Sequence, residues 1–302
     1  MKFCIQRMKF IRFLGDNSRP TLGFLNGDKI IIPNKPKSTD PYMDLIQFLY
    51  EAKRSKINLA HFFETLSSYN EVLFSELDKQ NRLIVPVESP EVWGCGITYK
   101  RSMDARELET SSKTVYGQIY LAERPEIFFK STPLRYVGPN APVYIRSDSK
   151  WNAPEPELAF VVGIAGEIFG YTIANDVSSR DIEGKNPLYL PQAKIYNGSC
   201  SFGPCITLSD QIENPHNLDI KMSILRAGSE IFKGRTNTSK MKRTIQELYT
   251  FLKKDNVMPP GLVCMTGTGI VPPDDFTLEL GDIVEIEIEK IGILKNPVLQ
   301  WK

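Results

Sequence analysis

Two apolar segments joined by a short loop constrain the fold of this chain more than any other feature. Residues 158–162 and 168–174 are rich in β-branched and aromatic side chains, and they flank the loop Gly163-Ile-Ala-Gly-Glu167. The length and glycine content of this loop are typical of a β-hairpin. We therefore predict an antiparallel hairpin in which Gly163 pairs with Ile168.

Three carboxylates meet at the open end of this predicted hairpin. Glu155 and Glu157 are two residues apart, so both side chains point to the same face of an extended chain. If Gly163 pairs with Ile168, Asp176 lies directly opposite Glu155. Facing Cβ atoms are roughly 4.5–5.5 Å apart, and like charges at this separation destabilise a sheet unless something compensates them. A divalent cation is the simplest compensation, so the three carboxylates are predicted to bind a metal ion.

The two faces of the predicted hairpin differ in side-chain size. The face with the carboxylates carries Ala159, Val161, Gly170, Thr172 and Ala174. The opposite face carries Leu158, Phe160, Val162, Tyr171 and Ile173. Small side chains leave room for a ligand, whereas large apolar ones form a core. We therefore expect a binding site on the carboxylate face and a buried core on the other.

A second interpretation of the two glutamates stays open. Pro154 and Pro156 are typical of a strand start or an edge strand, where Glu155 and Glu157 would be ordinary solvated residues. A slip of one residue in the hairpin would also turn Asp176 toward the core. If the carboxylates do bind a metal, all-oxygen ligation favours Mg²⁺, with Mn²⁺ or Ca²⁺ as alternatives, over zinc.

The composition is that of a globular protein with a small-molecule ligand. The chain has 302 residues, 41% of them hydrophobic, enough for one large domain or two modest ones. Its 37 Lys and Arg residues nearly balance 36 Asp and Glu residues, giving a formal net charge of +1. Nucleic-acid binders and membrane-surface proteins usually carry a clear positive excess. We therefore expect no nucleic acid and no membrane as partner, but a small neutral or anionic ligand.

Cysteine and histidine are too sparse for zinc or disulfide chemistry. The five cysteines include no Cys-x-x-Cys pair, and His61 and His216 are the only histidines. This pattern indicates reduced thiols in a cytosol, with Cys95 as a small buried side chain. The longest apolar stretch, residues 158–174, is interrupted by Glu167 and is shorter than the roughly 20 residues of a membrane helix. A cytoplasmic location is expected.

The periodicity of apolar residues predicts a small N-terminal α+β domain over residues 1–87. It would contain a β-element over residues 9–33, whose strands flank turn-rich segments, and helices over residues 44–53 and 58–77. The remainder, residues 88–302, forms the larger domain.

Five segments organise this larger part. Residues 92–99 are predicted to form an apolar strand. The charged residues 100–112 are predicted to form a helix that could act as a lid. Residues 241–254 predict an amphipathic helix, and residues 281–289 a half-buried strand with solvated glutamates. The loop 265–273 concentrates hydroxyls and backbone amides, which suits an anion.

Three motifs in this part together resemble the fumarylacetoacetate hydrolase family. They are Glu155-Pro-Glu157, Asn175-Asp-Val-Ser-Ser-Arg-Asp181 and Thr266-Gly-Thr268, within a resemblance that covers roughly residues 90–300. The resemblance implies an α+β, β-rich fold, a mixed β-sandwich roll with helices outside, over residues 88–302. It also implies metal ligands at Glu155, Glu157 and Asp176, and pairing of the chain as a homodimer or a higher homo-oligomer.

Within the family, the chain is similar to the 2-keto-3-deoxy-D-arabinonate dehydratase branch. The matching strings are residues 124–130, 155–159, 186–196 and 268–272. This similarity implies that Lys194 lies near the substrate and that Thr98 offers a hydroxyl, both as catalytic groups. A 2-keto acid substrate is anionic, so Lys130 and the loop at Gly267 and Thr268 are candidate substrate-binding residues.

One departure from the hydrolase pattern bears on the reaction. Hydrolases of the family typically place a histidine where this chain has Ser102, and that histidine belongs to a dyad that activates water. Without it, hydrolytic carbon–carbon cleavage lacks its general base, whereas elimination of water needs no activated water. The resemblance therefore favours a metal-dependent dehydratase of a 2-keto-3-deoxy sugar acid, which gives 2,5-dioxopentanoate through a metal-stabilised enolate.

Several alternatives stay open at this point. The same metal could serve a hydrolase or decarboxylase of a 2,4-diketo acid, or the chain could bind a metal without catalysis. Lys194 would be the base if it is neutral, and would hold the developing oxyanion if it is charged.

Overall fold

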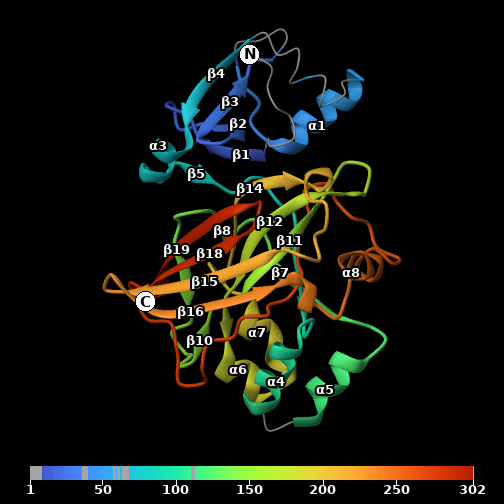
Figure 1. The fold of residues 1–302 in the computed structure, drawn as a ribbon, viewed down its shortest axis with the longest axis vertical. Coiled ribbons are helices and arrows are strands. Elements are labelled where there is room, and N and C mark those ends of the chain that lie inside the picture. The colour runs from blue at the N-terminus through green and yellow to red at the C-terminus, as the bar shows by residue number, and fades with distance from the viewer. Residues whose placement is uncertain are drawn as a thin grey trace.

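The fold consists of two large β-sheets with short helices outside them (Figure 1). The computed structural model describes residues 9–35, 40–56, 59, 62, 68–109 and 113–301. Within these residues the first sheet has the order β4-β3-β2-β1-β14-β12-β11-β17-β6-β7, with β5 beside β1 and β8 beside β14. The second sheet has the order β16-β15-β18-β19-β9, and β10 pairs separately with β13.

The elements have the following bounds. The first sheet contains β1 (Lys9–Leu14), β2 (Pro20–Asn26), β3 (Lys29–Pro33), β4 (Tyr69–Leu73), β5 (Leu83–Ile84), β6 (Val92–Gly96), β7 (Glu126–Ser131), β8 (Tyr136–Val137), β11 (Pro156–Val162), β12 (Ile168–Asp176), β14 (Cys200–Leu208) and β17 (Val263–Met265). The other strands are β9 (Val143–Ile145), β10 (Asn152–Ala153), β13 (Ser178–Ser179), β15 (Asp219–Arg226), β16 (Ser229–Asn237), β18 (Ile283–Ile288) and β19 (Gly292–Gln300). The helices are α1 (Leu45–Arg54), α3 (Phe74–Lys79), α4 (Lys100–Glu109), α5 (Lys113–Leu121), α6 (Arg180–Lys185), α7 (Leu190–Lys194) and α8 (Ile245–Leu252). The predicted α+β, strand-rich class is confirmed.

The predicted hairpin lies at the centre of the first sheet. β11 and β12 pair antiparallel in the predicted register at their carboxylate end, where Glu157 faces Ala174. The Asp176 N–H donates a hydrogen bond of 2.9 Å to the carbonyl oxygen of Glu155. The backbone therefore brings the two strand ends together as the sequence predicted.

The register is different at the loop end of the hairpin. A bulge after Val161 places Val162, not Gly163, opposite Ile168, so the predicted Gly163–Ile168 pair is wrong by one residue. The loop closes early, since the Gly163 N–H bonds to the Glu167 carbonyl oxygen at 2.8 Å. A bulge of this kind adds a residue to one strand and leaves the pairing beyond it intact.

Both faces of the hairpin are buried, which corrects the expectation of a ligand along its small-residue face. Leu158, Phe160, Val162, Tyr171 and Ile173 belong to a core with side chains of the second sheet. Ala159, Val161 and Ala174 belong to a second core with the aromatic side chains of β1, β2 and α1. The small residues serve close packing, because a Cβ at Gly170 would lie 2.5 Å from the Thr207 carbonyl oxygen of β14.

The N-terminal strands extend the first sheet. β1 pairs with β14, with Phe10 opposite Ile206, so the sheet is continuous across the predicted domain boundary at residue 87. The division into two domains stays a prediction. Strand β2 was not predicted, because residues 20–26 were interpreted as a turn-rich segment. Its alternate residues Leu22 and Phe24 are fully buried, as a strand between two neighbours requires.

Of the predicted N-terminal helices, one is confirmed. The other is confirmed in part, since its described residues 59, 62 and 74–77 are helical, the last four within α3, whereas residues 69–73 are not. α1 begins after Asp44, whose side chain accepts a hydrogen bond of 2.7 Å from the Gln47 N–H and caps the helix. In the predicted helix 58–77, residues 58, 60, 61 and 63–67, including His61, lie outside the described residues. Residues 69–73 form β4, because the edge of β3 offers a ladder that outweighs helical periodicity.

The later helices surround one end of the first sheet. The predicted helix 100–112 is confirmed as α4 up to Glu109, and residues 110–112 lie outside the described residues. The predicted helix 241–254 is α8, which starts at Ile245 because Thr244 caps it. Figure 1 places α4, α5, α6 and α7 at the end of the molecule opposite the N-terminal strands. Among the described residues, no helix is long and apolar enough to cross a membrane.

Leu158 tests the central position of the hairpin. Leu158→Ala should lower the free energy of unfolding by about 2–5 kcal/mol, because the side chain is fully buried and its truncation leaves a cavity. The matched variant Leu299→Ala removes a side chain that is 42% exposed on β19 and should cost less than about 1 kcal/mol. Urea unfolding followed by circular dichroism measures both, and similar costs would contradict the assignment.

Candidate metal centre and active site

The hairpin end brings three carboxylates together. Glu157 lies in β11, Glu155 directly before it, and Asp176 at the end of β12, and one oxygen of each lies within 4.8 Å of the others. All three are buried, at 4%, 1% and 1% exposure in chain order. The solvated-strand interpretation of the two glutamates is therefore wrong. Their role as metal ligands stays a prediction, and the geometry fits it.

Two lysines compensate these carboxylates. Lys194, the last residue of α7, places Nζ 2.7 Å from Glu155 Oε2 and 3.1 Å from Asp176 Oδ2. Lys130 of β7 is fully buried, with Nζ 2.6 Å from Asp176 Oδ1. Lys130 also donates to the carbonyl oxygens of Val177, at 3.2 Å, and Lys194. It therefore ties β7 to both the hairpin end and the end of α7.

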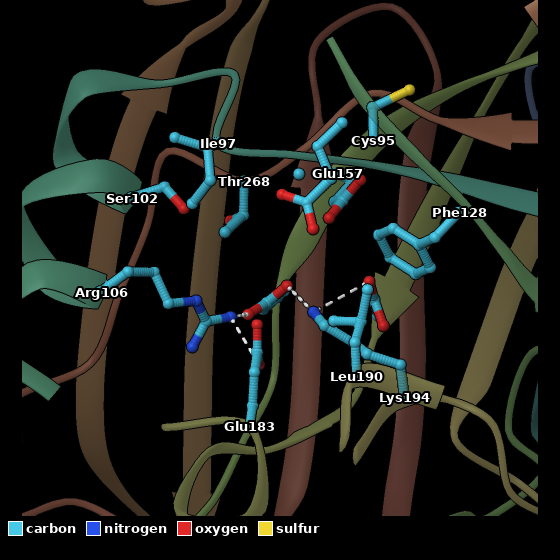
Figure 2. A pocket seen from close by; sticks show the side chains of 14 residues that line it. Cys95, Ile97, Ser102, Arg106, Phe128, Glu157, Glu183, Leu190, Lys194 and Thr268 are labelled. Carbon is cyan, nitrogen blue, oxygen red and sulfur yellow. Dashed lines mark hydrogen bonds and ion pairs between the residues drawn. The ribbon is translucent and has the colours of Figure 1, made fainter. Parts of the chain in front are cut away.

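Two arginines reach the same cluster from helices. Arg106 of α4 lies 2.6 Å from Glu155 Oε1 and 3.1 Å from Glu183 Oε2 of α6. Arg180, the first residue of α6, lies 3.2 Å from Glu155 Oε1. Figure 2 shows Arg106 reaching toward Glu183 from one side and Lys194 entering from the other. The segment predicted as a lid thus supplies a direct contact to the cluster.

The charges in this cluster shift one another's pKa. Burial raises the pKa of Glu157 well above its usual range, and the nearby charges of Asp176 and Glu155 raise it further. Burial alone would also raise the pKa of Asp176, but Lys130 and Lys194 prevail and lower it. Burial alone would lower the pKa of Lys194, yet Asp176 and Glu155 prevail and raise it. Lys194 is therefore an ammonium ion in this structure.

Glu126 is a site residue that the sequence analysis missed. It lines the pocket with the three carboxylates, and burial, followed by the charge of Glu183, raises its pKa to about 7. The alternation of β7 could have found it, since Glu126, Phe128 and Lys130 point to one face of the strand. Arg106 could have been found similarly, one helical turn after Ser102.

The loop after β17 holds Glu157. The Gly267 N–H donates a hydrogen bond of 2.5 Å to Glu157 Oε2. Gly267 has a φ of +93°, and a Cβ there would lie 1.9 Å from Thr98 Oγ1, so the close approach needs glycine. The Thr268 hydroxyl donates to the Pro156 carbonyl oxygen at 3.0 Å and the side chain lines the pocket.

The remaining predicted residues lie around the pocket in different ways. Thr98 is buried and donates its hydroxyl to the Thr266 carbonyl oxygen at 2.7 Å, so in this structure it braces the loop. Lys130 lies behind Asp176 and is not among the residues that line the pocket, whereas Lys194 lines it. The substrate contacts of Lys130, Thr98, Gly267 and Thr268 stay predictions. Cys95 is a buried free thiol, as expected.

The donor set suits a hard divalent cation. All three convergent side chains offer carboxylate oxygens, the ligands of Mg²⁺, and they offer neither sulfur nor imidazole. Five carboxyl groups lie among four cations here, namely Glu126, Glu155, Glu157, Asp176 and Glu183 among Arg106, Lys130, Arg180 and Lys194. Because the pKa of Glu126 is raised to about 7 and that of Glu157 well above its usual range, the cations at least balance the carboxylates that stay ionised. A divalent ion would give the site a net positive charge, suited to an anionic ligand.

Comparison with known proteins gives one family. Residues 105–299 match the family model described as fumarylacetoacetate (FAA) hydrolase C-terminal. The chain is 49% identical over 234 residues to 2-dehydro-3-deoxy-D-arabinonate dehydratase of Saccharolobus solfataricus, covering 76% of this chain and 78% of that protein. It is 50% identical over 214 residues to a probable 2-keto-3-deoxyxylonate dehydratase of Haloferax volcanii, covering 71% of this chain and 74% of that protein.

A solved structure extends the similarity to the whole fold. The structure of 2-keto-3-deoxy-D-arabinonate dehydratase complexed with magnesium and 2,5-dioxopentanoate has a TM-score of 0.81 and 41% identity to this chain. The match covers 98% of this chain and 100% of that one.

Glu126 gives the metal-free protein a testable pH dependence. Its pKa is about 7 in the folded state against 4.5 as the ordinary value, so the folded state holds the proton more tightly. Protonated Glu126 therefore contributes to the free energy of unfolding. This contribution is complete below about pH 4.5 and is lost as the pH rises through about 7. Glu126→Gln stays neutral, so above about pH 8 it should be more stable than the original protein by about 1–3 kcal/mol.

Urea unfolding in the presence of a chelator measures this difference. It should shrink to about 0.4 kcal/mol at about pH 4.5, and Glu123→Gln, which alters an exposed carboxyl group, should follow the original protein at both pH values. A Glu126→Gln protein that is less stable at about pH 8 would contradict the buried, proton-holding state of Glu126.

Proposed function

The chain belongs to the fumarylacetoacetate hydrolase family, and on that premise we propose that it is a Mg²⁺-dependent dehydratase. Its substrate is a 2-keto-3-deoxy sugar acid of the 2-keto-3-deoxy-D-arabinonate type, and its product is 2,5-dioxopentanoate. The observation that carries this proposal is the buried carboxylate triad in contact with the Lys194 ammonium group. This triad belongs to a chain that is 49% identical to a dehydratase of such a substrate.

The charge of the pocket supports a 2-keto acid as substrate. With a divalent ion present, the cluster would have a net positive charge, which favours the binding of a carboxylate anion. The pocket also carries the side chains of Phe128 and Leu190, which can cover the short carbon skeleton. At about 4 Å and an effective dielectric constant near 20, one opposite charge is worth roughly 4 kcal/mol before desolvation, enough to fix the orientation of the substrate.

Glu155, Glu157 and Asp176 are the residues that would hold the ion. When bound, Mg²⁺ supplies Lewis-acid polarisation of the 2-keto group, which makes the protons on C3 more acidic. The Gly267 N–H fixes one oxygen of Glu157, and Arg106 and Arg180 fix Glu155. These contacts fix the orientation of both carboxylates, and Lys194 holds the second oxygen of Glu155 at 2.7 Å.

The reaction needs one group that stays charged and one that changes protonation. A proton leaves C3, the C4 hydroxyl leaves as water, and a proton shift along the chain gives the aldehyde at C5. Lys194 keeps its proton, so we assign it to hold the negative charge that develops on the substrate oxygen. Glu126, with a pKa of about 7 in the same pocket, is suited to accept and return the moving proton at neutral pH.

No observation favours hydrolysis of a 2,4-diketo acid. Ser102 lines the pocket where hydrolases of the family typically have a histidine. Of the two histidines, His216 lies elsewhere, where its Nε2 accepts from the Ile245 N–H at 3.2 Å, and His61 is outside the described residues. The pocket residues described therefore include no imidazole to activate water.

Two further parts of the proposal concern the protein in the cell. We propose a cytoplasmic location, supported by the four described cysteines, which are all buried free thiols. We also propose a homodimer or a higher homo-oligomer.

Product analysis tests the reaction. The Mg²⁺-loaded protein should convert 2-keto-3-deoxy-D-arabinonate to 2,5-dioxopentanoate and should not release pyruvate from an acylpyruvate. Excess chelator should abolish the conversion, and Asp176→Ala should lower kcat/KM by at least about a thousandfold, because the charge balance and the ion are lost. Pyruvate release from the acylpyruvate alone would overturn the proposal, and full activity in chelator would remove the metal from it.

Lys194 can be tested separately from the metal. Lys194→Met should lower kcat by about 10²–10³-fold, since the developing negative charge loses its ammonium partner. The variant should still bind Mg²⁺ in isothermal titration calorimetry, which shows that the carboxylates remain in place. Lys185→Gln removes an exposed lysine of the adjacent α6 and should keep the original rate. A Lys194→Met enzyme within about fivefold of the original rate would exclude this role.

A further inference from the structure

A second cleft lies on the other side of the loop that follows Thr268. It has a volume of about 480 Å³, which lies within the range of roughly 300–1,000 Å³ for small-molecule sites. Residues 269–271 line it from the loop, residues 99–101 from the start of α4, and Phe232 and residues 234–236 from β16. Thr268 lines the metal pocket instead, so one short loop separates the two spaces.

The side chains that line this cleft carry only positive charges. Lys100, Arg101, Arg235 and Lys240 line it, and no acidic residue does. Arg235 is paired with Asp219 at 2.7 Å. Lys100, Arg101 and Lys240 form no ion pair with any residue in the described ranges, and all three are exposed. A concave surface with unpaired charges of one sign concentrates ions of the other sign.

Tyr99 is a buried residue of the cleft wall. It lines the cleft, is 1% exposed, and has a buried hydroxyl oxygen. Burial raises the pKa of Tyr99, and the charge of Glu157 in the metal pocket raises it further, so the hydroxyl keeps its proton. The polar contacts that the cleft offers to a ligand therefore come from its exposed cations.

The first turn of α4 adds donors of a second kind. The helix begins at Lys100, and its first hydrogen bond runs from the Met103 N–H to the Tyr99 carbonyl oxygen at 3.2 Å. The N–H groups of residues 100–102 therefore have no acceptor inside the helix. The positive end of the helix dipole and these donors favour an anion at the same place as the lysines and Tyr99.

We propose that this cleft is a second ligand site, separate from the metal pocket, which binds a small organic anion of the sugar phosphate class. Lys100, Arg101, Lys240 and the start of α4 bind the phosphate. Phe232, Ile270 and Val271 supply an apolar wall that a bare inorganic ion would leave uncovered. Two negative charges on one group match several cations better than the single charge of a carboxylate.

The cleft is connected to the metal pocket by α4. The first turn of this helix lines the cleft, and its later residues Ser102 and Arg106 point into the metal pocket (Figure 2). A ligand that orders the start of α4 therefore also orders Arg106, which contacts Glu155 at 2.6 Å. Binding at the two sites should be coupled for this reason.

Calorimetry on the Mg²⁺-loaded protein, with ribose 5-phosphate as the probe, tests the site. Saturable binding is expected at low ionic strength, weaker at high salt because the charges are exposed. Lys240→Gln and Arg101→Gln should each weaken binding by at least about fivefold. Lys233→Gln removes an exposed lysine of the same strand region that is paired with Glu230 at 3.3 Å, and it should leave binding unchanged.

Two controls identify the site and the class of anion. Lys194→Met, which alters the metal pocket, should keep ribose 5-phosphate binding, and saturating pyruvate, a 2-keto carboxylate, should not compete with it. The proposal is overturned if binding is absent, if pyruvate competes fully, or if Lys240→Gln and Arg101→Gln bind like the original protein.

Discussion

The arrangement of this molecule depends on compensation of charge inside a buried site. Glu155, Glu157 and Asp176 are almost fully removed from water, and an ionised carboxylate in such a place is costly unless a cation pairs with it. Lys194 and Lys130 supply that pairing from α7 and β7, elements far from the hairpin in sequence. The same ion pairs that make burial tolerable therefore fix the positions of the strands and helices around the pocket.

The three carboxylates could be predicted because their placement depends on local rules. A period of two puts Glu155 and Glu157 on one face, and a hairpin register carries Asp176 to the same point. The predicted register relied on a Gly163–Ile168 pair that does not form, yet it holds at the carboxylate end. The bulge after Val161 adds its residue on the loop side only, where Phe169 packs against Phe10 at 5.3 Å between ring centroids.

The rest of the site depends on tertiary contacts that sequence periodicity does not contain. Arg106 and Glu155 are 49 residues apart, and Lys130 and Asp176 lie on strands that are not neighbours in the sheet. The same limit explains β4, which forms where helical spacing predicted a helix, because the edge of β3 was available. It also explains the small-residue face of the hairpin, which the N-terminal aromatic side chains cover.

Lys194 and a divalent cation compensate the same oxygens, and this sets how they share the site. The ammonium group lies 2.7 Å from Glu155 and 3.1 Å from Asp176, distances at which it neutralises charge that an ion would otherwise neutralise. An ion bound by these carboxylates weakens their hold on Lys194 through mutual repulsion. The ammonium group would stay in the pocket, since α7 fixes its backbone, and it would then be free to pair with an anionic ligand. Glu155, Glu157 and Asp176 would in this way hold the ion while Lys194 contributes positive charge to ligand binding.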